Sequence, residues 1–156
     1  MAANILKALK ESSWLKSAEH DENYDCIYSV FSACQLENSR GLRTRSLDIL
    51  VTENLTETDR NSVALRGIVI KNSRYDLFCD EKLSEFMEFV DYYYIAVPDS
   101  PEMIEAAQAV KQSGWGVITM DRSGKIRVVV EPLRHQPMFR DITLSNIIIA
   151  LASRVW

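Results

Sequence analysis

The feature that most constrains the fold is a pair of apolar runs separated by a segment with helical periodicity. "VALRGIVIKNS" at residues 63–73 and "DYYYIAVP" at residues 91–98 each contain one run with the length of a buried strand. Between them, "DLFCDEKLSEFMEFV" at residues 76–90 repeats apolar residues at helical spacing, which predicts one helix packed on a sheet. Strand, helix and strand in this order predict a right-handed crossover unit.

The segments on either side continue the alternation of strands and helices. We expect further strands over residues 26–37, 42–53, 115–120 and 125–132, and further helices over residues 3–17, 100–114 and 138–155. The helix over residues 100–114 has the clearest ends, because Ser100 is suited to cap it and Pro101 to begin it. The sequence therefore predicts an α/β fold with a mixed central sheet flanked by helices.

Length and composition limit the class of protein. The chain has 156 residues, which fits a single domain over residues 1–156. No apolar run approaches the roughly 18 residues that span a bilayer, and the N-terminal residues lack the pattern of a signal peptide. We therefore expect a cytoplasmic protein with no membrane contact. The formal net charge of −4 argues against non-specific coating of nucleic acid, since that binding depends on neutralising phosphates.

Two charged residues lie where two predicted strands would meet. Asp48 interrupts the apolar segment "SLDILV", and an ionised aspartate in such a strand is costly unless it is paired or liganded. Lys71 ends the strand that follows. If the two strands are adjacent, Asp48 and Lys71 lie at the same edge of the sheet, where they could form an ion pair.

An aspartate that faces an acid-x-lysine strand end is an arrangement suited to phosphodiester hydrolysis. Two carboxylates hold a hard cation such as Mg²⁺, the cation activates water, and the lysine orients or deprotonates that water. This chain has Asp48 and Lys71, but the second acid position is occupied by Val69.

The residues that follow form a longer pattern. In the family pattern that they resemble, an acid-x-lysine strand end precedes Ser-Arg-x-Asp, Asp-x-Lys, a Glu beside an aromatic residue, and an aspartate that opens an aromatic strand ending in Ala-Val. The residues that match this pattern without a gap are Lys71, Ser73, Arg74, Asp76, Asp80, Lys82, Glu85, Phe86, Asp91, Tyr93, Tyr94, Ala96 and Val97. In this pattern the chain resembles the PD-(D/E)XK nuclease superfamily, and within it the MmcB-like family of small bacterial DNA-repair proteins. The similarity covers most of residues 40–131, and "RTRSLD" resembles the basic residues that precede the family's first metal-binding aspartate.

The resemblance implies a restriction-endonuclease-like fold and, if the chain is active, hydrolysis of DNA assisted by Mg²⁺ or Mn²⁺. Asp48 would be a metal ligand, Lys71 would lie beside the water, and Glu85 would supply a second ligand. The residues expected to contact phosphates are Arg43, Arg45 and Arg74.

Val69 leaves three interpretations open. The site is inactive and the fold binds nucleic acid or protein; or the carboxylate has moved to the next helix, where Glu81, Glu85 and Glu88 recur at helical spacing; or the likeness is architectural only. The partners considered are DNA and another protein, including a second copy of the chain docked through the aromatic strand or the C-terminal helix.

The same residues also have simpler, purely structural interpretations. Lys71 fits the end of a buried strand whose amine reaches water. The run Tyr92-Tyr93-Tyr94 alternates across a strand, so we expect it to pack in the sheet rather than to stack bases. The short basic segment around Arg43 is typical of a solvated turn.

Overall fold

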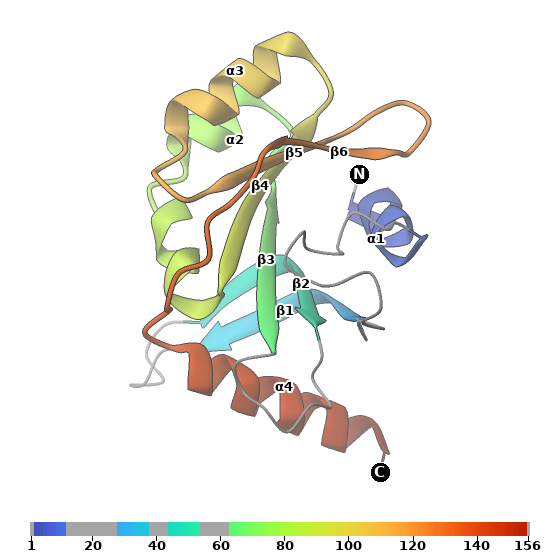
Figure 1. Ribbon diagram of the computed structural model, residues 1–156, viewed down its shortest axis with the longest axis vertical. Helices are drawn as coiled ribbons and strands as arrows, with labels where there is room; N and C mark the ends of the chain where they lie inside the picture. The colour runs from blue at the N-terminus through green and yellow to red at the C-terminus, as the bar shows by residue number, and fades with distance from the viewer. Residues whose placement is uncertain (1, 12–27, 38–43, 54–62, 156) are drawn as a thin grey trace.

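The computed structural model describes residues 2–11, 28–37, 44–53 and 63–155 (Figure 1). Its helices are α1 (Ala2–Glu11), α2 (Arg74–Cys79), α3 (Pro101–Val110) and α4 (Arg140–Val155), with a 3₁₀ helix, η1 (Leu83–Phe89). Its strands are β1 (Tyr28–Glu37), β2 (Thr44–Glu53), β3 (Ala64–Ile70), β4 (Tyr92–Pro98), β5 (Gly116–Met120) and β6 (Ile126–Val130).

The six strands form one sheet in which the spatial order is the sequence order, β1 to β6. Strands β1, β2 and β3 are antiparallel neighbours, and β6 is antiparallel to β5. Strand β4 is parallel to both β3 and β5. The predicted α/β fold with a mixed sheet and flanking helices is confirmed, and so is the parallel pairing of the two strands that opened the sequence argument.

Each face of the sheet has its own apolar core. On one face, Tyr93, Ile95 and Trp115 pack with buried residues of α2, η1, α3 and α4. On the other face, the sheet residues pack against Ile5 and Leu9 of α1. Figure 1 shows α1 on one side of the strands and α3 on the other. The tyrosine run 92–94 is buried and divided between the two cores, which confirms that it packs within the sheet.

Gly67, in the middle of β3, allows a close approach on the α2 side of the sheet. A Cβ atom there would lie 3.0 Å from both Cγ atoms of Val90 and 3.2 Å from Leu47 Cδ1. The missing side chain therefore lets Val90 pack directly on β3.

The predicted helix over residues 76–90 is wrong in one respect, because the segment is divided into α2 and η1. The division lies at Asp80, which has non-helical dihedral angles (φ −86°, ψ 87°). Its Oδ1 accepts a hydrogen bond from the backbone N–H of Lys82 at 3.0 Å. An aspartate that bonds the backbone beyond it favours a turn over a continuing helix. Residues 12–17 of the first predicted helix lie outside the described part of the chain.

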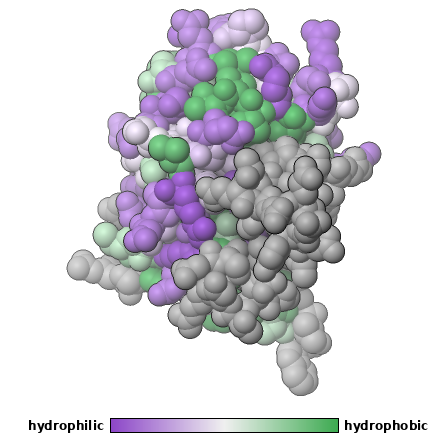
Figure 2. Space-filling model, viewed as in Figure 1, coloured by the Kyte–Doolittle hydropathy of each residue, from purple (hydrophilic) through white to green (hydrophobic). Residues whose placement is uncertain are grey.

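Figure 2 shows apolar side chains gathered on the upper part of the viewed face, where β5 and β6 lie in Figure 1. Met120 and Val128 are half-buried and pack against the core on this face. None of the described helices is long and apolar enough to cross a membrane.

Candidate functional site

Asp48 extends the pairing of β2 with β3 by means of its side chain. The backbone register runs from the pair Glu53 and Ala64 to the pair Ile49 and Ile68. Beyond it, the backbone N–H of Ile70 donates a hydrogen bond to Asp48 Oδ2 at 2.7 Å. The predicted position of Asp48 at the end of β3 is confirmed, and one of its carboxylate oxygens is bound to the backbone.

Lys71 leaves the sheet directly after β3. Its backbone N–H donates to the carbonyl oxygen of Ala96 at 2.9 Å, and its Nζ lies 2.6 Å from Asp80 Oδ2. The Lys71 side chain is 15% exposed and that of Asp80 is 26% exposed. The expected ion pair between Asp48 and Lys71 is wrong, because the break between α2 and η1 brings the Asp80 carboxylate to the ammonium group.

Tyr93 completes this group of side chains from β4. It is fully buried, and its phenol oxygen has no hydrogen-bond partner among the described residues. Burial raises the pKa of Tyr93 well above its usual value, and the negative charges of Asp80 and Asp48 raise it further. Both carboxylates therefore act on one phenol, and we refer to Asp48, Lys71, Asp80 and Tyr93 as the acid–lysine cluster.

Val69 lies on the same side of β3 as Lys71 but belongs to the apolar core. It is 3% exposed, packs in the core that contains Leu77 and Tyr93, and pairs with Ile95 of β4. The position where the nuclease pattern has an acid is therefore an interior one. A carboxylate at this position would need a cation or hydrogen-bond donors to be stable.

The glutamates expected to replace that acid do not share one helix. Glu81 is exposed in the turn after α2, whereas Glu85 is half-buried in η1 and Glu88 is exposed there. The backbone N–H of Glu85 donates to the carbonyl oxygen of Lys82 at 3.0 Å. Asp80 is the carboxylate from this segment that contacts Lys71. Sequence reasoning matched Asp80 to the pattern without giving it a role; the signal was an aspartate able to break the helix.

The arginines predicted to contact phosphates are described to different degrees. Arg43 lies outside the described residues, and Arg45 lies in β2, opposite Leu36 of β1. Arg74 begins α2 and is exposed; its Nη1 lies 3.5 Å from Glu102 Oε1. An exposed pair at this distance contributes little to stability, so Arg74 can exchange its partner.

The donors of the acid–lysine cluster do not fit a resident Mg²⁺ or Mn²⁺ ion. In the part of the chain that the structure describes, no three His, Cys, Asp or Glu side chains gather closely enough to hold a metal. Asp48 is bonded to the backbone and Asp80 to Lys71, while Val69 offers no ligand. Hard divalent cations take six or more oxygen ligands, usually with several from the protein or its substrate.

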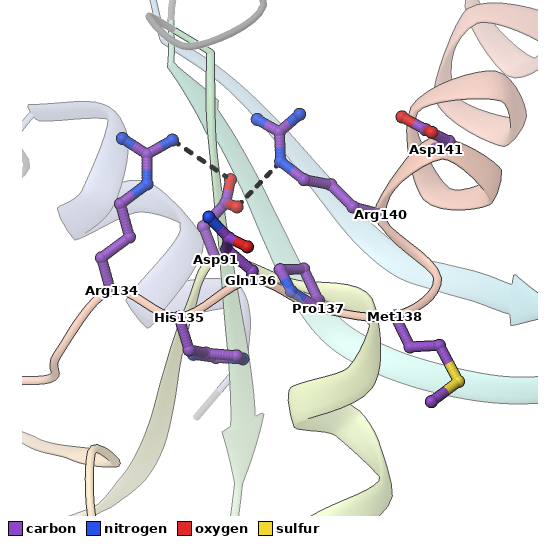
Figure 3. Close-up of a pocket in the computed structure, with 8 residues that line it drawn as sticks. All are labelled: Asp91, Arg134, His135, Gln136, Pro137, Met138, Arg140 and Asp141. Atoms are coloured by element: carbon purple, nitrogen blue, oxygen red, sulfur yellow. Dashed lines mark hydrogen bonds and ion pairs between the residues drawn. The ribbon is translucent and has the colours of Figure 1, made fainter.

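A separate acidic residue, Asp91, lies in a pocket at the other end of β3 and β4 (Figure 3). Asp91 Oδ1 accepts a hydrogen bond from Arg140 Nε at 2.8 Å, and Oδ2 accepts one from the backbone N–H of Leu65 at 2.8 Å. Arg134 Nη2 lies 4.0 Å from Oδ2. Figure 3 shows Arg134 and Arg140 on either side of the carboxylate.

Both arginines also reach the backbone of the chain before β3. Arg140 Nη2 donates to the carbonyl oxygen of Val63 at 2.6 Å, and Arg134 Nη2 donates to it at 3.2 Å. The backbone N–H of His135 donates to the Asp91 carbonyl oxygen at 3.1 Å. These contacts tie the segment after β6 and the start of α4 to the sheet. We call Asp91, Arg134 and Arg140 the Asp91 clamp, since its contacts are internal and structural.

Comparison with known proteins gives a likeness of fold. No family model and no curated protein matches the chain. Among solved structures, the chain is similar to the SPO1766 protein of unknown function from Silicibacter pomeroyi, with a TM-score of 0.56 and 18% sequence identity. The likeness covers 82% of this chain and 77% of that one. At this identity it supports the α/β fold alone.

Proposed function

We propose that the protein is a nucleic-acid-binding module on a restriction-endonuclease-like fold that does not hydrolyse phosphodiesters. One observation carries the proposal: the Lys71 ammonium is 2.6 Å from Asp80 Oδ2 at the site where an active nuclease would need a metal and a free lysine. The resemblance to PD-(D/E)XK proteins supports this fold and DNA as the partner. We place this binding in the cytoplasm.

The chemistry of the cluster supports a binding role over a catalytic one. The Lys71 Nζ lies 2.6 Å from Asp80 Oδ2, so the amine is engaged by a carboxylate instead of being directed at a water molecule. Asp48 uses one oxygen to hold the end of β3, which is a structural task. Lys71 neutralises Asp80, Asp48 is hydrogen-bonded to the backbone, and Val69 lies in the core, so each carboxylate has a partner other than a metal ion.

Contacts with nucleic acid are expected at the same edge of the sheet. Arg74 follows Lys71 closely in the chain, and Arg45 precedes Asp48 on β2. Contacts to phosphates are salt-dependent, because binding releases counterions from the nucleic acid. Replacing Arg43 and Arg45 together with alanine should therefore weaken DNA binding, and the loss of affinity should be larger at low salt than at high salt. Unchanged binding in that variant would remove these arginines from the proposal.

The test is a cleavage and binding assay with labelled single- and double-stranded DNA in Mg²⁺ or Mn²⁺. The native protein, Asp48→Ala and Lys71→Ala should all bind DNA and should all leave it intact. Cleavage by the native protein that disappears in Asp48→Ala would contradict the proposal and would identify Asp48 as part of an active site. Absence of binding to either form of DNA would contradict the binding role.

A further inference from the structure

We infer that Tyr75 and Phe78 on α2 form a stacking surface for the bases of a single-stranded nucleic acid, with Arg74 contacting its phosphates. The inference rests on the proposed function and names the form of nucleic acid that the module binds. It differs from the expected phosphate contacts because it depends on two aromatic rings that no motif singled out.

The two rings are exposed because of the way α2 is anchored. Leu77 is the buried residue of this short helix, and it faces the core. Tyr75 and Phe78 are three residues apart and so lie on neighbouring positions of the helix surface. They are 75% and 52% exposed. The remaining exposed large apolar side chains of the described residues are aliphatic: Leu133, Met138, Ile148 and Ile149.

A cation accompanies the rings. The Arg74 guanidinium carbon lies 5.7 Å from the centroid of the Phe78 ring, and its ion pair with Glu102 joins two largely exposed side chains. Exposed rings beside an exchangeable guanidinium match the alternating bases and phosphates of a strand. An apolar peptide would use the rings but not the arginine. A duplex would offer phosphates but hides the faces of its bases.

The position of α2 links this surface to the acid–lysine cluster. Ser73 caps the helix by accepting a hydrogen bond from the backbone N–H of Asp76 at 3.1 Å, and Asp80 ends it beside Lys71. The two rings therefore lie on the helix that ends at the cluster. Asp76 and Glu81 are exposed nearby, and the net charge is −4, so stacking rather than charge should carry most of the affinity.

Fluorescence anisotropy with a labelled single-stranded oligonucleotide of mixed sequence, and with its duplex, tests the inference. Tyr75→Ala and Phe78→Ala should each weaken single-strand binding roughly tenfold or more, at low and high salt alike. Tyr75→Phe keeps the ring and should bind like the native protein. Arg74→Gln should weaken binding mainly at low salt. Ile149→Ala, which removes an exposed apolar side chain from α4, is the matched control and should have no effect.

The outcomes separate this inference from the function on which it rests. If the native protein binds the duplex and Tyr75→Ala and Phe78→Ala leave single-strand binding unchanged, the inference fails while the proposed function stands. If the native protein binds neither form, both fail. All of the substituted side chains are on the surface, so the variants should unfold at the native temperature, which circular dichroism checks.

Discussion

The acid–lysine cluster and the Asp91 clamp lie at opposite ends of the parallel strands β3 and β4, and they use the same kinds of residue differently. In the clamp, each oxygen of the 3% exposed Asp91 side chain accepts a hydrogen bond, and Arg140 is shared with a backbone carbonyl. In the cluster, Lys71 and Asp80 are partly exposed and the Tyr93 phenol has no described partner. In the clamp, both oxygens of the buried carboxylate have hydrogen-bond donors, whereas in the cluster the Tyr93 phenol oxygen has no described partner.

This difference distinguishes the two ends of the parallel strands by the burial of their polar groups. The amino end of β4 is fixed by the buried Asp91 carboxylate, both oxygens of which accept hydrogen bonds. The carboxyl ends of β3 and β4 keep polar groups within reach of solvent, as the carboxyl ends of parallel strands do in many α/β proteins. The cluster lies at this carboxyl end but, within the described part of the chain, lacks the carboxylates that would hold a metal ion.

The comparison predicts its largest effect in the clamp. Asp91→Ala leaves Arg140 and the backbone N–H of Leu65 without their buried acceptor, so the free energy of unfolding should fall by about 3–5 kcal/mol. Urea denaturation measures the loss. The matched control is Asp99→Ala, which breaks the exposed pair with Arg127 and should change the stability by less than about 1 kcal/mol. Equal losses in the two variants would contradict the distinction.

The next effect concerns the apolar residue that separates the cluster from a metal site. Val69→Glu places a carboxylate in the core and should lower the free energy of unfolding by about 3 kcal/mol without metal. Mn²⁺ should restore much of this loss if the new carboxylate joins Asp48 and Asp80 around the ion. Val69→Gln, with the same size and no charge, should be insensitive to Mn²⁺; a response in that variant would place the ion elsewhere.

A third prediction concerns the buried Tyr94 and the stability of the protein at alkaline pH. Burial raises the pKa of Tyr94 to about 12, although the hydrogen bond from Arg66 lowers it. The unfolded chain releases this proton near pH 10 and the folded chain holds it, so stability falls as the pH rises from about 10 to about 12. The loss should be about 2–3 kcal/mol. Thermal unfolding at several pH values measures it, with Tyr94→Phe as the variant that reduces the slope, because buried Tyr93 still contributes in this range; an unchanged slope in Tyr94→Phe would contradict the assignment.

The smallest effect belongs to the ion pair of the cluster. Lys71→Met should lower the free energy of unfolding by about 1 kcal/mol, because Lys71 and Asp80 are partly exposed to water. A double-mutant cycle with Asp80→Asn isolates the coupling between them. A coupling free energy as large as the loss caused by Asp91→Ala would mean that the Lys71–Asp80 pair stabilises the fold as strongly as the clamp does.

The sequence predicted what depends on local pattern. The strands over residues 63–73 and 91–98 followed from their continuous apolar runs, and the parallel pairing followed from the helix between them. The division of that helix was missed, because it depends on the Asp80 side chain competing for the backbone. This also hid the partner of Lys71.

The clamp could not be predicted, because Arg140 and Asp91 are 49 positions apart and join only when the sheet has formed. Asp48 was recognised because an acid in an apolar strand demands a partner, but that partner proved to be the backbone of Ile70. Phe78 belongs to the apolar residues over 76–90 that were expected to pack on the sheet; this was wrong, because Leu77 faces the core and Phe78 is 52% exposed. Tyr75 was not singled out.

Calorimetric titration with Mn²⁺ tests most directly the central claim that the acid–lysine cluster does not hold a divalent cation. The native protein should show no site-specific binding at millimolar Mn²⁺, and Val69→Glu should bind about one ion. Stoichiometric binding to the native protein that is abolished in Asp48→Ala would contradict the claim and would restore the case for an active metal site.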